Sequence, residues 1–211
     1  MKQIWPQFDF TKPRLFNPDT DSLDSIALDG SECLVFFLGG MVDNTSGALR
    51  GFSKNPRDPF IVDNGSRAGP FFEFKGGFSG GAPIGRLVDT DGDGAPEYLD
   101  TLPSQINPYV YFSSYDGAGY GPDNTEDTNL NGALDPGEDK NLNGTLDERM
   151  KRPYFKDAAF KVPYHTDSFQ IISPGVDFEY GNGGHFDINN PPTINQGSDN
   201  IANFHGGVLG G

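Results

Sequence analysis

The sequence contains little of what several protein classes require. Cys33 is the only cysteine among 211 residues, which excludes an intramolecular disulfide and a zinc site built from cysteines. The longest unbroken apolar run, residues 33–38, is short. A membrane-spanning helix needs about 20 apolar residues and the core of a signal peptide about 7–15. We therefore expect no direct insertion of this chain into a membrane, and we interpret Cys33 as a small buried hydrophobic residue rather than a reactive thiol.

Basic residues are also scarce. Fifteen Lys and Arg stand against 30 Asp and Glu, which gives a net charge of −15 and excludes a nucleic-acid partner. Glycine (29) and proline (17) are abundant and break helix interiors, so a helical bundle or coiled coil is excluded. The 18 Phe and 8 Tyr, in contrast, provide enough surface for an ordered core.

The order of patterns along the chain predicts an α+β fold. Residues 1–20 hold three prolines and no clear periodicity and are interpreted as an extended lead-in. Residues 21–211 are interpreted as a single globular domain with acidic insertions at 89–100 and 123–148. Residues 21–38 predict one broken helix or two short ones, with Ser31 as an N-cap and Gly39-Gly40 as the stop.

Strands are predicted where aromatic and β-branched residues lie between turn residues. Residues 108–115 and 169–173 are the strongest candidates, and residues 86–88 and 97–99 predict a further pair around an intervening loop. Weaker expectations are a short strand at 71–74 and a flexible surface loop at 76–81. The expected architecture is an N-terminal helix packed on a small antiparallel β-sheet, with long connections.

The acidic segments match the twelve-residue loop that binds calcium. In such loops acids or amides alternate at positions 1, 3 and 5, a glycine at position 6 permits the sharp turn, and further acids follow at positions 9 and 12. The candidate ligands are Asp89, Asp91, Asp93, Glu97 and Asp100 in the first loop, and Asp127, Asn129, Asn131, Asp135 and Glu138 in the second. A third, incomplete repeat contains Asp139, Asn141, Asn143 and Asp147, with Met150 where the last acid belongs.

Calcium explains these segments better than the alternative, that they are ordinary solvated Asp-Gly and Asn-Gly turns. A hard cation takes six to eight oxygens at about 2.3–2.6 Å, which alternate side chains on a tight turn provide. The pattern occurs three times, twice in tandem. Long amphipathic flanking helices are missing, so we expect structural Ca²⁺ sites that order the long loops rather than a sensor that opens a helix pair.

Catalytic signatures are weak. His165, His185 and His205 share no metal-ligand spacing, and neither a nucleophile elbow nor a Walker lysine is present. We therefore expect a non-enzymatic protein. The third-ranked alternative is a calcium-stabilised hydrolase that uses a pair of carboxylates.

The C-terminal half carries a recognisable order of motifs. Aromatic residues at 108–112 are followed by a strand-like segment at 168–177, then by Gly181, Gly183 and Gly184, and finally by Asp-Asn-Ile-Ala-Asn-Phe at 199–204. This order resembles the globular domain of bacterial type II secretion major pseudopilins and related type IV pilin-like proteins. The family pattern is a strand ending in S-x-G-x-D-G, a glycine-rich loop and D-[DN]-I-x-N-[WF]. Here Phe178 replaces the glycine after the aspartate.

This resemblance, which spans about residues 30–210, implies a structural subunit of a filament. Its partners would be other pilin-like subunits, and its location would be periplasmic or extracellular, in the cell envelope. The family also implies a calcium ion in the C-terminal loop, for which Asp177 and Asp199 are the candidate ligands. The hydrophobic assembly helix of the family is not among these residues, so the expectation is that it was removed or never existed. The runner-up function is a calcium-dependent extracellular module that binds a carbohydrate or a protein.

Overall fold

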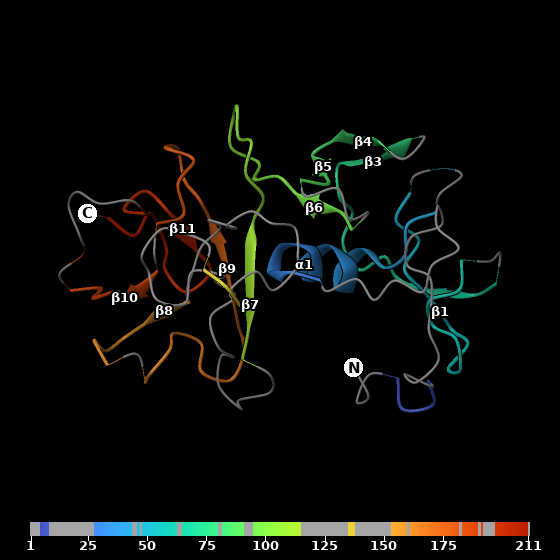
Figure 1. Cartoon of the computed structure of the whole chain (residues 1–211), viewed down its shortest axis with the longest axis horizontal. Coiled ribbons are helices and arrows are strands. Elements are labelled where there is room, and N and C mark those ends of the chain that lie inside the picture. The colour runs from blue at the N-terminus through green and yellow to red at the C-terminus, as the bar shows by residue number, and fades with distance from the viewer. Residues whose placement is uncertain are drawn as a thin grey trace. The chain divides into compact units, whose positions relative to one another are not determined.

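Figure 1 shows a computed structural model of the chain, which forms two compact units, Met1–Leu99 and Asp100–Gly211. The single domain expected over residues 21–211 stays a prediction. The structure describes residues 5–8, 28–43, 46, 48–62, 65–79, 82–90, 95–114, 135–137, 153–159, 161–181, 183–189, 191 and 197–210.

The first unit contains a short helix and small antiparallel sheets. Strand β1 pairs with β2, β3 with β4, and β5 with β6, so each sheet has two strands. The elements are α1 (Gly30–Gly39), β1 (Phe52–Ser53), β2 (Arg67–Ala68), β3 (Gly76–Ser79), β4 (Ala82–Gly85), β5 (Leu87–Val88) and β6 (Glu97–Tyr98).

Helix α1 begins with a capping box. Asp29 Oδ1 accepts hydrogen bonds from the amides of Ser31 (2.7 Å) and Glu32 (2.9 Å), and Glu32 Oε2 accepts one from the Asp29 amide (2.6 Å). The N-cap is therefore Asp29, and the prediction of Ser31 was wrong. The predicted stop is confirmed, because the helix ends at Gly39 and Gly40 has the positive φ of 79° that favours glycine.

The core of the first unit is a cluster of aromatic rings. Phe36 of α1 lies 5.2 Å from Phe52 of β1, and Trp5 lies 5.0 Å from Phe52 and 4.9 Å from Phe60, measured between ring centroids. The rings meet in tilted or edge-to-face arrangements, which their quadrupoles favour. The helix therefore packs against side chains of loops and of a two-residue strand.

The second unit contains the largest sheet. Strand β9 lies between β7 and β11 and is antiparallel to both, with Val110 opposite Ile172 and Ile201 opposite Ser173. A separate parallel pair joins β8 to β10. The strands are β7 (Val110–Ser113), β8 (Tyr154–Phe155), β9 (Phe169–Ser173), β10 (Gly184–His185) and β11 (Ile201–Ala202).

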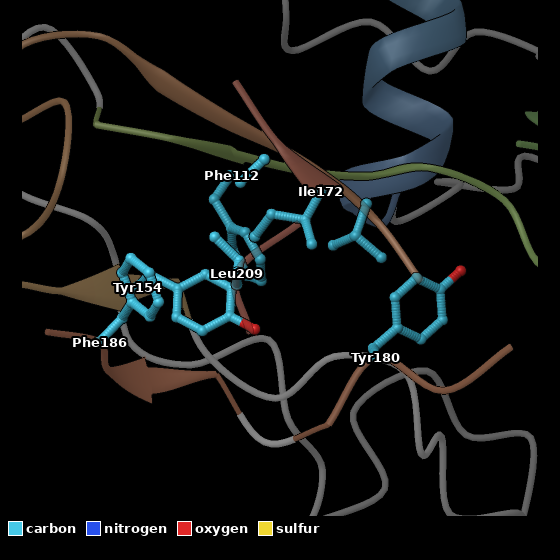
Figure 2. Close-up of a cluster of buried hydrophobic side chains, with 8 residues drawn as sticks. Phe112, Tyr154, Ile172, Tyr180, Phe186 and Leu209 are labelled. Atoms are coloured by element: carbon cyan, nitrogen blue, oxygen red, sulfur yellow. The ribbon is translucent and has the colours of Figure 1, made fainter. Parts of the chain in front are cut away.

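Figure 2 shows the hydrophobic core of the second unit. Ile172 is fully buried, and the rings of Tyr154 and Phe186 lie 6.0 Å apart. Gln170 is buried in the same unit. Its side chain makes hydrogen bonds with backbone groups between strands β8 and β9, which do not pair with each other. Its side chain accepts from the amide of Tyr154 (2.7 Å) and donates to the carbonyls of Tyr154 and Tyr164 (2.9 Å each). A polar side chain thus ties β8 to β9 where no backbone pairing joins them.

The predicted fold class, α+β with an N-terminal helix packed on a small antiparallel sheet, is wrong. The described residues contain one ten-residue helix and several small, mostly antiparallel sheets, so the protein is mainly β. The physical reason is that the apolar run at 33–38 supports a helix of only ten residues, and its Phe36 joins an aromatic cluster instead of covering a sheet face. The periodic residues Leu23, Ile26 and Ala27 lie outside the described residues.

Individual elements were predicted with mixed success. The strands at 169–173 and within 108–115 are confirmed, and so is the pair formed by residues 87–88 and 97–98. Residues 71–74 are not a strand, because the amides of Phe71 and Phe72 both donate to the carbonyl of Leu38. Residues 76–79 form a hairpin with β4 rather than a loop. Within the described part of the chain, the length and hydropathy of the helix are too low for crossing a bilayer.

Candidate functional site

Most of the predicted calcium ligands lie outside the described residues. The structure describes six of the candidates, and among the residues it describes no group of three or more His, Cys, Asp or Glu side chains is placed to hold a metal ion. The candidates outside the described residues are Asp91, Asp93, Asp127, Asn129, Asn131, Glu138, Asp139, Asn141, Asn143 and Asp147. The described ones are Asp89, Glu97, Asp100, Asp135, Asp177 and Asp199.

Glu97 connects the two ends of the first acidic loop. Its side chain is fully buried on β6, and Oε2 accepts hydrogen bonds from the amide (3.0 Å) and the hydroxyl (2.5 Å) of Thr90. Thr90 and Glu97 are positions 2 and 9 of the predicted loop. Thr90 follows strand β5, and Glu97 is the first residue of β6, opposite Val88. The antiparallel pair and this side chain therefore close the loop at its base.

Asp100, position 12 of the same loop, begins the second unit. Its carboxylate is buried, with Oδ1 accepting from the amide of Leu102 (2.9 Å) and Oδ2 accepting a short hydrogen bond from the hydroxyl of Ser173. The first bond forms an Asx turn and the second reaches the end of strand β9. Both oxygens therefore hold protein groups in place.

Asp199, a candidate ligand in the C-terminal loop, contacts the turn that follows strand β9. Its Oδ2 accepts hydrogen bonds from the amides of Val176 (2.5 Å) and Asp177 (2.9 Å), which lie in the turn after β9. Gly175 has a φ of 72°, and a Cβ atom there would lie 2.5 Å from Asp199 Oδ2. Only glycine allows so close an approach between this turn and the carboxylate.

The turn between Gly175 and Glu179 keeps a glycine-like backbone without a second glycine. Phe178 occupies the position where the pseudopilin pattern has glycine, and its φ is 68°. A bulky residue rarely adopts this left-handed conformation, so the surrounding structure must impose it. Asp177 is exposed, and its Oδ1 accepts from the amide of Glu179 (2.8 Å), which fixes the same turn.

A buried polar cluster lies next to Asp199. The side-chain amide of Asn200 donates to the hydroxyl of Tyr154 (3.1 Å) and to the carbonyl of Tyr180 (2.7 Å). Burial raises the pKa of Tyr154 to about 12; the hydrogen bond from Asn200 opposes this shift and the charge of Asp199 adds to it. The phenol therefore stays protonated at neutral pH beside the carboxylate.

Two buried side-chain oxygens at Asp199 and Asn200 could contribute to a cation site. Asp199 Oδ1 and Asn200 Oδ1 are buried and have no hydrogen-bond partner among the described residues. Buried oxygens normally have a partner, and carboxylate and amide oxygens are the ligands that calcium takes. This geometry supports Asp199 as a candidate ligand. Asp177 contacts Asp199 through its backbone amide, not through its carboxylate.

Sequence reasoning missed the polar residues that shape this region. Ser173, Gln105 and Asn200 carry no motif for such a role, although Ser173 and Asn200 lie within the segments that resemble pseudopilins. Gln105 lies in a stretch with no pattern, so no signal in a single sequence marks it.

The structure describes the three histidines and the cysteine that were considered for catalysis. His165 and His185 are exposed and His205 is half-buried, in agreement with their prediction as surface or loop residues. Burial raises the pKa of Cys33 to about 12, with smaller contributions from the charges of Asp29 and Glu32. Its thiol is therefore protonated at neutral pH and a weak nucleophile.

Comparison with known proteins leaves this geometry as the main guide to function: the chain matches no protein-family model, no curated protein and no solved structure.

Proposed function

We propose that the chain is a non-enzymatic structural subunit, the globular domain of a pseudopilin-like protein in a secretion or pilus-type filament, stabilised by calcium. In this proposal its partners are other pilin-like subunits and its location is periplasmic or extracellular. The argument depends on the motifs of the C-terminal half and on how they pair in the second unit.

The observation that carries the proposal is that the two halves of the motif form one structural unit. Strand β11, which contains Ile201 and Ala202, pairs with the end of β9. Asn203 extends this contact, because its Oδ1 accepts from the amide of Ile171 (3.0 Å) and its own amide donates to the Ile171 carbonyl (3.2 Å). The residues of the resemblance thus have structural roles, as expected for a motif that maintains a fold rather than an active site.

Phe204, the last residue of the motif, supports the same interpretation. Its ring stacks on Tyr164 at 4.3 Å between centroids and lies 5.6 Å from Tyr154. The motif therefore begins at a polar turn, through Asp199, and ends in the hydrophobic core. A cation at Asp199 would neutralise the partly buried carboxylate at the point where the two halves meet.

Calcium binding is the part of the proposal that purified protein tests. The cation would take oxygen from Asp199 and Asn200, with Asp177 and backbone carbonyls as further candidates. We expect excess chelator to lower the melting temperature of the second unit by about 5 °C or more, because an ion that binds only the folded state stabilises it. Native mass spectrometry should show one calcium ion fewer in Asp199→Asn.

The matched control is Asp187→Asn, which changes a carboxylate of the same unit whose Oδ1 accepts a hydrogen bond from the amide of Asn189 (2.9 Å) in an Asx turn. It should keep the wild-type number of ions. Equal melting temperatures in excess calcium and in excess chelator would refute the role of calcium. For the filament, cross-linking in the source cells should capture the chain with pilin-like subunits, and its recovery only as a monomer would contradict assembly.

The binding-module alternative is favoured by one feature of the first unit. Phe71 and Phe72 are 66% and 48% exposed, and both amides are fixed to the carbonyl of Leu38. Exposed rings held on a rigid turn are suited to stacking against a sugar or an apolar side chain. Retention on a polysaccharide resin that is lost in Phe71→Ala/Phe72→Ala would support this alternative, and equal retention of both proteins would exclude it for this turn.

A further inference from the structure

A chain of buried polar groups runs from Asp100 to the turn that holds Asp199. Asp100 is 1% exposed and Ser173 is 4% exposed. The hydroxyl of Ser173 donates to Asp100 Oδ2 and accepts from the amide of Gly175 (3.1 Å). One hydroxyl group therefore joins the carboxylate of Asp100 to the first residue of the turn.

Two further side chains hold the same turn from the segment that follows Asp100. Gln105 Nε2 donates to the carbonyl of Gly175 (2.9 Å), and Asn107 Nδ2 donates to the carbonyl of Phe178 (2.6 Å). The Asp100 amide in turn donates to the carbonyl of Asn107 (3.1 Å), which closes the segment on itself. The segment thus binds the turn at its first and fourth residues.

These contacts explain the unusual backbone of the turn. The positive φ of Phe178 is unfavourable for a bulky residue, and the hydrogen bonds at Gly175 and Phe178 fix the turn on both sides. In that conformation the amides of Val176 and Asp177 both point at Asp199 Oδ2. The other oxygen, Oδ1, is the buried atom that fits a cation.

We propose that Asp100 is a positioning residue for the cation site at Asp199, acting through Ser173, and not a ligand of the acidic loop at 89–100. A ligand at position 12 of a calcium loop normally contributes both carboxylate oxygens to the ion. In Asp100 both oxygens instead accept hydrogen bonds from Leu102 and Ser173. The inference rests on the proposed calcium site at Asp199 and assigns a different role to an acid that the loop pattern includes.

The first test measures calcium affinity by isothermal titration calorimetry in Ser173→Ala and Asp100→Asn. Each variant should keep the wild-type number of bound ions but bind one of them about tenfold more weakly, because a hydrogen bond that orients the turn is lost. Asp187→Asn is the control and should keep wild-type affinity. An unchanged affinity in both test variants would overturn the proposal.

A double-mutant cycle separates positioning from ligation. In the Asp199→Asn background the C-terminal site is already lost, so adding Asp100→Asn should change neither the number nor the affinity of the remaining ions. If Asp100 is a ligand of the acidic loop, adding the substitution removes a further ion, which would overturn the proposal. Position 173 provides a second cycle that does not alter any candidate ligand.

Hydrogen exchange keeps this test distinct from that of the proposed function. In excess chelator, Ser173→Ala and Asp100→Asn should each accelerate exchange of the Val176 and Asp177 amides about tenfold relative to wild type and Asp187→Asn. If wild type binds no calcium, the proposed function fails. Unchanged exchange in both variants, with calcium still bound normally, shows instead that Asp100 does not position the turn.

Discussion

The two units of the chain differ in how far apart in the sequence the hydrogen-bond partners of their buried polar side chains lie. In the first unit the buried carboxylates bond locally: Glu32 to the amide of Asp29 and Glu97 to Thr90. In the second unit Asp100 also has a local bond, to Leu102, but two bonds of buried side chains join residues 70 and 73 positions apart, Gln105 with Gly175 and Asp100 with Ser173. Local bonds shape the end of a helix or the base of a loop, whereas the long-range ones join separate segments.

The units also differ in how neighbouring backbone segments within each unit approach each other. In the first unit, glycine allows direct contact: a Cβ atom at Gly51 would overlap the carbonyl oxygen of Ala68, across the β1–β2 pair. In the second unit, the side chain of Gln170 fills the space between β8 and β9. Close packing in the first unit therefore requires that Gly51 has no side chain, whereas packing in the second unit requires the side chain of Gln170.

The largest expected effect tests the second unit. Gln170→Ala leaves the amide of Tyr154 and the carbonyls of Tyr154 and Tyr164 without their buried partner, so we expect a loss of about 4 kcal/mol in the free energy of unfolding. Hydrogen exchange of second-unit amides in increasing urea measures it. Thr166→Ala, at an exposed position, is the control. A loss below about 1 kcal/mol would show that the side chain is not required.

The next effect tests the first unit. Gly51 has a φ of 64°, so Gly51→Ala combines an unfavourable backbone with a steric clash, and we expect a loss of about 3 kcal/mol. Fluorescence of Trp5, the only tryptophan, reports on this unit because its ring packs on Phe52 and Phe60. Gly207→Ala is the control, since no atom lies within 4 Å of a Cβ atom placed there. Equal stability of the two variants would contradict close packing at Gly51.

The smallest expected effect concerns alkaline pH. Burial raises the pKa of Tyr154 from 10.0 to about 12, so the folded state keeps a proton that the unfolded state releases above pH 10. The stability from this group is complete below pH 10 and is lost as the pH rises toward 12. Tyr154→Phe should reduce the loss of stability of the second unit between pH 10 and 12.

Cys33 provides the matching test in the first unit. Its pKa is raised from 9.0 to about 12, so the corresponding loss begins one pH unit lower, above pH 9. Cys33→Ala should flatten the pH dependence followed by Trp5 fluorescence and leave that of the second unit unchanged. Identical slopes for both variants and wild type would show that neither group contributes.

Part of the fold was predictable from local patterns. The strand at 169–173 combines aromatic and β-branched residues, and Gly40 follows the apolar run that forms α1. The short strand expected at 71–74 failed because the amides of Phe71 and Phe72 bond to Leu38, a partner that periodicity does not reveal. The helix start was misplaced by two residues because Ser31 and Asp29 are both good caps, and only the reciprocal bond with Glu32 distinguishes them.

In the candidate site, too, sequence patterns pointed to some residues and not to others. Asp199 and Asp177 were predicted as ligands from their place in a family pattern, which stays a prediction, and Phe178 departs from that pattern. The roles of Ser173, Gln105 and Asn200 were not identified, because each depends on a partner between 20 and 73 residues away. Uncharged polar side chains of this kind carry no charge pattern or spacing by which they can be recognised.

The amino-acid sequence by itself determined the acidic character of the chain, the strand-forming segments and the positions where glycine ends an element. These are properties of single residues and their immediate neighbours. Only the tertiary structure decided that the helix would join an aromatic cluster and that Asp100 would face Ser173. Such pairings depend on which distant segments share one core, and neighbouring residues in the sequence do not specify this.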